Sequence, residues 1–267
     1  MFWRKKERHR GSFPDILCEQ QSMMGQGLHF AAAEAYKLLR TNLMFSFPGE
    51  DPNAKIIGVT SSLKGEGKSL TAINLGYTIA QAGKTVLIVE CDLRLPSIAR
   101  RLKLQPSLGL SDLLVGLCPL EQILRQDVLT QKLDVIPAGT IPPNAAELLE
   151  SERMRRTLAH LAQYYDYILL DLPPVMVVSD ALIVSKLTSG MLVVVRDQYA
   201  EKTALAQTMR QLKFVNAKVL GFVLNAAQST MDSDRKYRRK YGYGRYSYDE
   251  KAAQRDENGR RGRRSAR

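Results

Sequence analysis

Six short apolar runs, most of them without alternating polar residues, recur along the middle of the chain. Strands that are buried on both faces have this pattern, whereas a strand with one solvated face alternates. The runs occupy residues 55–60, 85–90, 133–137, 167–171, 191–196 and 219–224. Segments with helical spacing lie between them, at residues 34–45, 69–82, 145–163, 180–187 and 202–214. This alternation predicts an α/β fold, a doubly wound and mostly parallel sheet flanked by helices, with its functional site at the carboxyl ends of the strands.

The first apolar run leads into a glycine-rich turn that is followed by a helix. The turn and the first helical residues read Gly65, Glu66, Gly67, Lys68, Ser69, Leu70. Glycines in this position let backbone N–H groups surround a phosphate, and the helix presents its positive end. We therefore predict an ATP site of the P-loop type here, with Lys68 on the β- and γ-phosphates and the Ser69 hydroxyl on Mg²⁺. The strict motif has glycine where Ser62 stands, but the strand before and the helix after favour a nucleotide site over a chance turn.

Two further apolar runs end in carboxylates. Glu90, Asp92 and Arg94 follow one run at a spacing of two, which in an extended backbone puts the three side chains on the same side. Asp171 ends another run, directly before Leu172 and two prolines. Buried strands that end in Asp at the catalytic edge supply the anions that a hydrated metal needs, so Ser69, Asp92 and Asp171 are the predicted Mg²⁺ ligands. One such carboxylate alone would be read as a solvated charge, but three elements in this order favour a site that hydrolyses ATP or transfers its phosphoryl group.

The charge of the chain is concentrated at its two ends. Residues 1–10 carry five Lys or Arg against one acidic residue, and residues 231–267 carry thirteen against six, so the ends account for eleven of the twelve net positive charges. With 267 residues, of which 45% are hydrophobic, the chain fits one α/β domain with mobile ends. We predict a basic, flexible segment at 1–30, a P-loop kinase domain at 31–230 and a disordered basic tail at 231–267. Such ends attract a membrane surface or a polyanion.

Five of the eleven tyrosines lie in the basic tail, among arginines, lysines and glycines. They are Tyr237, Tyr241, Tyr243, Tyr246 and Tyr248. An ATP site together with a cluster of phenolic hydroxyls on a mobile arm suggests that the arm accepts phosphoryl groups. Cations interleaved with aromatic residues also suit stacking on single-stranded nucleic acid, and an inert linker is a third interpretation. After a kinase-like domain, a substrate tail is the favoured interpretation and no nucleic-acid partner is expected.

Neither the cysteines nor the apolar runs indicate an extracellular or membrane-spanning chain. Cys18, Cys91 and Cys118 have no metal-ligand spacing, which favours reduced thiols in a cytoplasmic protein. The longest apolar runs have the length of strands, and no apolar stretch follows the basic amino terminus. We expect no signal peptide and no transmembrane helix, so membrane association would come from charge or from a partner.

From about residue 30 to residue 248, the chain resembles the cytoplasmic kinase domain of bacterial protein-tyrosine kinases, the BY-kinase family. The P-loop and the two acidic motifs carry the resemblance, together with residues 136–144 and the Glu-Leu-Leu that follows at 147–149. Glu34, Lys37 and Arg40 are similar to a Glu-x-x-Arg-x-x-Arg subunit contact of that family, with one conservative change.

The resemblance implies autophosphorylation of the tail tyrosines with ATP and Mg²⁺, largely between subunits of a ring-like homo-oligomer. It also implies a role in capsule or exopolysaccharide synthesis and export. The implied partners are a membrane-embedded polysaccharide co-polymerase that acts as activator, and a phosphotyrosine phosphatase, with the kinase held at the inner face of the membrane. Glu90 or Asp92 would accept the tyrosine proton, and Arg94 would bind transition-state charge or pair with an acid. Asn225 is similar to the family's adenine-side position, or is a structural turn asparagine.

Two departures from the family pattern leave other functions open. The family usually has Asp where this chain has Glu90, and Pro where it has Lys64, so activity would be reduced or differently dependent on metal. One alternative is a partition- or division-type switch ATPase without phosphotransfer to protein; Leu63 stands where such ATPases carry a lysine, and they need no tyrosine tail. The other is a weakly active scaffold for polysaccharide assembly.

Overall fold

The structure is a computed structural model and describes residues 23, 28, 30–47, 54–105 and 107–226. The chain divides into two compact units, Met1–Asn225 and Ala226–Arg267, and every helix and strand given below belongs to the first. The basic segment predicted at 1–30 lies largely outside the described residues. The predicted tail and its five tyrosines lie outside them entirely.

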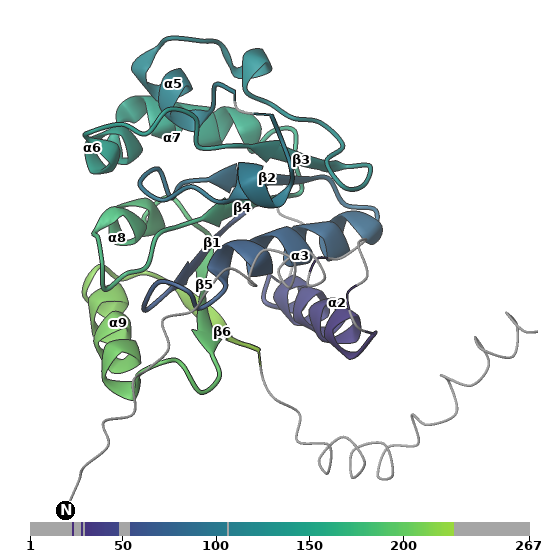
Figure 1. Cartoon of the computed structure of the whole chain (residues 1–267), viewed down its shortest axis with the longest axis vertical. Helices are drawn as coiled ribbons and strands as arrows, with labels where there is room; N and C mark the ends of the chain where they lie inside the picture. Colours follow the sequence, from purple (N-terminus) through teal and green to yellow (C-terminus); the bar gives the residue numbers. More distant parts are fainter. Residues whose placement is uncertain (1–22, 24–27, 29, 48–53, 106, 227–267) are drawn as a thin grey trace, which may run out of the picture. The chain divides into compact units, whose positions relative to one another are not determined.

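The first unit is built on one sheet of six strands in the order β3-β2-β4-β1-β5-β6 (Figure 1). All of the strand pairs are parallel. The strands are β1 (Lys55–Ser61), β2 (Val86–Glu90), β3 (Leu133–Ile136), β4 (Tyr167–Asp171), β5 (Gly190–Arg196) and β6 (Val219–Asn225). Each of the six apolar runs is a strand, which confirms the predicted parallel sheet. In this order, β2 and β3 lie on one side of β1, and β5 and β6 lie on the other, so the sheet is doubly wound.

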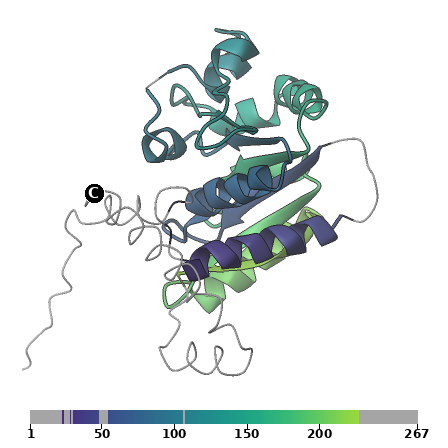
Figure 2. The same ribbon diagram turned by 90° about the vertical axis from the view of Figure 1, so that its right-hand side faces the viewer.

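Helices cover both faces of the sheet (Figures 1 and 2). On one face lie α2 (Phe30–Phe45), α3 (Lys68–Gln81) and α4 (Ile98–Arg101). The other carries α5 (Leu110–Val115), α6 (Ala145–Glu150), α7 (Glu152–Leu161), α8 (Asp180–Ser185) and α9 (Lys202–Phe214), and a short 3-10 helix, η1 (Leu120–Gln122), joins α5 to β3. Helix α2 packs beside α3, as both views show.

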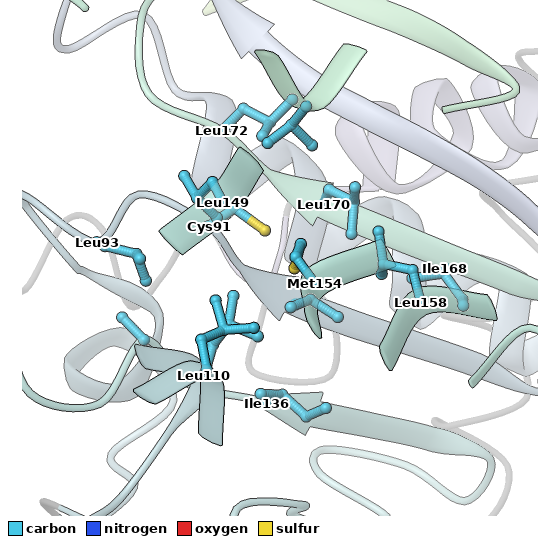
Figure 3. Packing of buried hydrophobic residues seen from close by; sticks show 14 of the residues in the cluster. Cys91, Leu93, Leu110, Ile136, Leu149, Met154, Leu158, Ile168, Leu170 and Leu172 are labelled. Carbon is cyan, nitrogen blue, oxygen red and sulfur yellow. The ribbon is translucent and has the colours of Figure 1, made fainter. Parts of the chain in front are cut away.

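Successive residues of the inner strands belong to different cores, which explains why their apolar runs do not alternate. Val86 of β2 packs into the cluster on the α3 face, and its neighbour Leu87 packs into the cluster on the α7 face. Figure 3 shows the second cluster, where Ile168 and Leu170 of β4 lie beside Leu158 of α7. A strand between two apolar layers has no solvated face, so every position is apolar until the strand ends.

The long helix predicted at 145–163 is two helices, because the chain turns at Ser151. The backbone of Ser151 is extended, with ψ of 152°, and its hydroxyl accepts a hydrogen bond from the Met154 amide at 3.2 Å. Serine is a favoured N-cap residue, so the second helix starts here. Helices α4 and α5 were not predicted, since four and six residues are too few for a helical period to be seen.

Two smaller points bear on the expectations from sequence. Cys91 and Cys118 are free, buried thiols, and Cys18 lies outside the described residues. Within the described ranges, no helix has both the length and the apolar character needed to span a bilayer.

The centre of the sheet leaves no space for a side chain at Gly58 of β1. A Cβ atom there would come within 2.3 Å of Met191 Sδ and 2.9 Å of Leu172 Cδ1, whereas at Gly221 of the edge strand β6 it would meet none of the described residues within 4 Å. We expect Gly58→Ala to lower the free energy of unfolding by about 1–3 kcal/mol through overpacking. Gly221→Ala should be neutral or slightly stabilising. Urea unfolding of both variants tests this, and equal effects would contradict it.

Candidate active site

The loop between β1 and α3, residues 62–67, has the conformation of a phosphate-binding loop. Gly65 and Gly67 have φ of 87° and 97°, a left-handed conformation that glycine adopts without strain. The buried carboxylate of Glu66 accepts a hydrogen bond from the Leu63 amide at 2.8 Å and so closes the loop. Gly67 is the N-cap residue of α3, so the loop leads directly into the positive end of a 14-residue helix. Leu70, in the first turn of α3, is partly buried against the core on the α3 face.

Lys68, Asp92 and Asp171 meet at the start of α3. Glu90 and Asp171 are register partners at the ends of the neighbouring strands β2 and β4. By strand parity both side chains project to the α3 face, where Lys68 begins the helix. Lys68 Nζ lies 2.8 Å from Asp92 Oδ2 and 3.8 Å from Asp171 Oδ1. The P-loop lysine therefore bridges the two acidic motifs.

The pair of carboxylates around Lys68 is buried and only partly neutralised. Asp171 is fully buried, and neither of its carboxylate oxygens has a hydrogen-bond partner within the described part of the chain. Burial raises the pKa of Asp171, and the positive charge of Lys68 opposes this effect. Burial alone would lower the pKa of Lys68, but the charges of Asp171 and Asp92 raise it above its usual value. One ammonium group thus serves two carboxylates that have little access to water.

Glu90 is bound by backbone amides on three sides. Its Oε1 accepts hydrogen bonds from the amides of Ser97 and Ile98, the second at 2.6 Å, and its Oε2 accepts one from Ala138 at 3.2 Å. Burial raises the pKa of Glu90, while the bonds from Ile98 and Ser97 lower it. The carboxylate therefore ties the end of β2 to the start of α4 and to the segment that follows β3. These three bonds occupy both of its oxygens.

Arg94 does not lie on the same side as Glu90 and Asp92, contrary to the spacing argument. Strand β2 ends at Glu90, so the backbone beyond it is no longer extended. Arg94 Nε and Nη2 contact the two carboxylate oxygens of Asp180 at 2.9 and 3.2 Å. Asp180 is fully buried and opens α8, in the other helical layer. Sequence reasoning missed Asp180, whose only signal was an acidic residue at the start of a predicted helix.

Residues at and just after the carboxyl ends of β5 and β6 contact the phosphate-binding loop. Asn225 Nδ2 donates a hydrogen bond to the Glu66 carbonyl at 2.9 Å. Arg196 and Tyr199 also donate to carbonyls of this loop, and neither was predicted from the sequence. An arginine at the end of a strand and a tyrosine in the loop after it carry no sequence signal for such a contact, since their acceptors lie more than 130 positions away.

The predicted subunit-contact residues lie on α2. Lys37 Nζ pairs with Glu34 Oε1 at 2.7 Å on the exposed surface. Arg40 Nη1 donates to the Thr78 carbonyl of α3 at 3.0 Å, so in this structure it joins α2 to α3.

The oxygen donors at the site suit a magnesium ion bound together with phosphates. Ser69, Asp92 and Asp171 supply a hydroxyl and two carboxylates, and no described residue makes a hydrogen bond to the buried oxygens of Asp171. Mg²⁺ prefers such ligands and usually takes one or two carboxylates plus substrate phosphate oxygens. Within the described residues, no group of three or more His, Cys, Asp or Glu side chains could hold a metal by itself. The donor set fits a metal–nucleotide complex better than a free ion.

Comparison with known proteins shows the family to which the chain is similar. Residues 54–221 match the AAA domain family. The chain is 35% identical over 211 residues to the tyrosine-protein kinase YwqD of Bacillus subtilis. The aligned region covers 79% of this chain and 85% of YwqD. It is 32% identical over 214 residues to the tyrosine-protein kinase ptk of Acinetobacter johnsonii, but spans 27% of that longer protein. The kinase domain of the Escherichia coli tyrosine kinase ETK has a TM-score of 0.72 at 26% identity, covering 84% of this chain and 85% of that one.

The electrostatics of the site predict that Asp171 costs stability in the absence of nucleotide. Because its pKa is raised by folding, the folded protein binds this proton more tightly than the unfolded chain does. Its ionised form therefore destabilises the fold at every pH above the unfolded pKa of about 4. We expect Asp171→Asn to raise the free energy of unfolding by about 1–2 kcal/mol at pH 7.5 in EDTA. Urea unfolding measures this.

Asp166 provides a matched control with the opposite sign. Although partial burial opposes its ionisation, hydrogen bonds from Thr85 and the charge of Lys84 lower the pKa of Asp166. Its stabilising effect is therefore present above the unfolded pKa and is lost as the pH falls through the folded pKa. Asp166→Asn should destabilise the protein modestly, by less than about 1 kcal/mol because the pair is partly exposed. Destabilisation by both substitutions would contradict the account of Asp171.

Proposed function

The chain belongs to the bacterial tyrosine-protein kinase family, so its activity is protein-tyrosine phosphorylation, and we propose that it transfers the γ-phosphoryl group of ATP to its own tail. The proposed acceptors are the five tyrosines between Tyr237 and Tyr248, and the transfer takes place between subunits. The observation that carries this proposal is the contact of Lys68 with both Asp92 and Asp171 beneath the phosphate-binding loop. Such a group of charges is suited to bind and transfer phosphate.

Nucleotide binding would rearrange the charges of the site. The amides of residues 65–70 and the start of α3 bind the phosphates, and Lys68 moves from Asp92 to the β- and γ-phosphates. Ser69, Asp92 and Asp171 would hold Mg²⁺, which when bound neutralises charge on the phosphate oxygens. The oxygens of Asp171 support this assignment, because their burial is compensated by no hydrogen bond within the described residues and only by Lys68 at 3.8 Å. Asn225, which already contacts the loop, borders the adenine side.

The acceptor step needs a group that takes the phenolic proton. The tyrosine oxygen forms a bond to the γ-phosphorus, the bond between that phosphorus and the bridging oxygen of ADP breaks, and the proton leaves the hydroxyl. Glu90 is fully buried and accepts three backbone hydrogen bonds, whereas Asp92 accepts one, from the Leu95 amide, beside its ion pair with Lys68. Because Lys68 would move to the phosphates and free one oxygen of Asp92, we assign the proton to Asp92. Glu90 then holds the ends of β2 and β3 in position. For Arg94 we propose anchoring of the acidic loop, because its guanidinium pairs with Asp180.

Transfer between subunits requires an assembly, for which α2 offers a surface. Phe30, Leu38 and Phe45 are 64%, 62% and 80% exposed, and Glu34 and Lys37 lie between them on the same side of the helix. A stripe of exposed apolar residues beside charged ones is typical of an interface. This supports a ring-like homo-oligomer formed through Glu34, Lys37 and Arg40, in which Arg40 would also hold α2 against α3.

Family membership supports the wider role that we propose. The kinase works with a membrane-embedded polysaccharide co-polymerase that activates it, at the inner face of the membrane, in capsule or exopolysaccharide synthesis. A phosphotyrosine phosphatase reverses the modification. Each phosphate brings about −1.5 to −2 charges, so about four to five phosphates would cancel the net +7 of residues 231–267. Phosphorylation would thus release the tail from acidic neighbours and loosen the oligomer.

The activity can be tested by intact-mass and phosphopeptide analysis of the full chain after incubation with Mg-ATP. We expect phosphates on residues 237–248, and we expect Lys68→Met to slow their appearance at least about 100-fold, because the lysine stabilises charge in the transition state. Lys84→Met is the control, since Lys84 is ion-paired with Asp166 just before β2 and β4, at the amino ends of the strands and away from the site. The measurement is made with and without the cytoplasmic tail of a candidate activator.

Two other results would change the assignment. ATP turnover with an unmodified tail, even with activator present, would favour a switch ATPase. No turnover and no phosphate with activator present would favour a weakly active scaffold.

The assembly surface can be tested separately. We expect Leu38→Glu to shift the oligomer toward monomer, because it places a charge in the apolar stripe of α2. Leu117→Glu is the matched control, since Leu117 is 74% exposed and follows α5. Sedimentation velocity measures both variants, and an unchanged distribution for Leu38→Glu would exclude α2 from the interface.

A further inference from the structure

Three side chains donate hydrogen bonds to three consecutive carbonyls of the phosphate-binding loop. Tyr199 Oη donates to the Lys64 carbonyl at 3.0 Å, and Arg196 Nη1 donates to the Gly65 carbonyl at 3.1 Å. Asn225 Nδ2 donates to the next carbonyl, that of Glu66, at 2.9 Å. We call Arg196, Tyr199 and Asn225 the carbonyl clamp.

The clamp residues are held in a fixed relation to one another. Arg196 and Asn225 are register partners at the ends of β5 and β6, and the Asp197 amide bonds to the Asn225 carbonyl at 2.9 Å. The Arg196 guanidinium lies 5.4 Å from the centre of the Tyr199 ring, within the range of a cation–π contact. A turn closed by the Tyr199 and Ala200 amides on the Arg196 carbonyl fixes the short connection between them. The donors are therefore part of the sheet edge.

The clamp sets the direction of the amides that face a phosphate. In a planar trans peptide, the carbonyl of one residue points opposite to the N–H of the next. Holding the carbonyls of Lys64, Gly65 and Glu66 toward the clamp therefore turns the N–H groups of residues 65, 66 and 67 away from it. A Cβ atom on Gly67 would come within 1.9 Å of Asn225 Nδ2, so the approach of the clamp also requires glycine there.

We propose that Arg196 and Tyr199 are positioning residues that preset the loop amides for the β-phosphate of the nucleotide. The proposal rests on the nucleotide site described under the proposed function. Neither side chain needs to touch the nucleotide, because each acts through a peptide plane of the loop. The clamp fixes three amides before a ligand arrives, so less conformational freedom is lost on binding.

Binding of ADP and of AMP to the full chain, in the presence of Mg²⁺, tests the clamp. We expect Tyr199→Phe to weaken ADP binding about fivefold, because the freed peptide must then be ordered when the nucleotide binds. Arg196→Met, which removes both the hydrogen bond and the stacking, should weaken it by at least as much, and Arg196→Lys should recover part of the loss. AMP has no β-phosphate, so each variant should bind AMP with the affinity of the wild-type protein. The melting temperature of the free protein should also be unchanged. Tyr164→Phe is the control, because Tyr164 is an exposed tyrosine that contacts His160.

Each outcome distinguishes the clamp from the nucleotide site itself. If the wild-type protein binds ADP and the variants bind it equally well, the clamp is overturned and the proposed function stands. Equal losses of ADP and AMP affinity, or a lowered melting temperature that accounts for the loss, would also overturn it, because they indicate a general effect on the fold. If the wild-type protein does not bind ADP, the proposed site is wrong and the clamp falls with it.

Discussion

The burial of acidic side chains around one lysine is the constraint on which this site depends. Parallel strands all end at one edge of a sheet, and β2 and β4 are neighbours, so their terminal carboxylates come together. Glu90, Asp92 and Asp171 are at most 4% exposed. Backbone amides satisfy the first, but Lys68 must serve the other two. A site of this kind is electrostatically incomplete, and a cation bound with phosphate oxygens is the chemistry that completes it.

The two halves of the sheet contribute different parts of the site. The side with β2 and β4 supplies the carboxylates, and Glu90 holds their surroundings in place through backbone hydrogen bonds. The side with β5 and β6 supplies Arg196, Tyr199 and Asn225, which contact the loop from outside. The phosphate-binding loop follows β1, the strand between these halves, so both can act on it. This division explains why residues far apart in the chain converge on one loop.

The sequence predicted those features that depend on short-range rules. The strand set follows from apolar runs, and the loop follows from glycines between a strand and a helix. Two expectations failed where the local backbone changed: Arg94 left the side of Glu90 because β2 ends there, and Ser151 divided a predicted helix by capping a new one. Arg196 and Tyr199 could not be predicted, because a hydrogen bond to a loop carbonyl depends on tertiary position and not on a local pattern. The tail tyrosines are known from sequence alone.

The most direct test of the account is the position of Lys68 in a crystal structure of the full chain with Mg²⁺ and ADP. In the present structure, Lys68 Nζ lies 2.8 Å from Asp92 Oδ2. The account predicts that Lys68 leaves Asp92 for the β-phosphate, and that Ser69 and the two carboxylates surround the metal directly or through water. A complex in which the pair of Lys68 and Asp92 persists, or in which the phosphates lie away from residues 65–70, would contradict it.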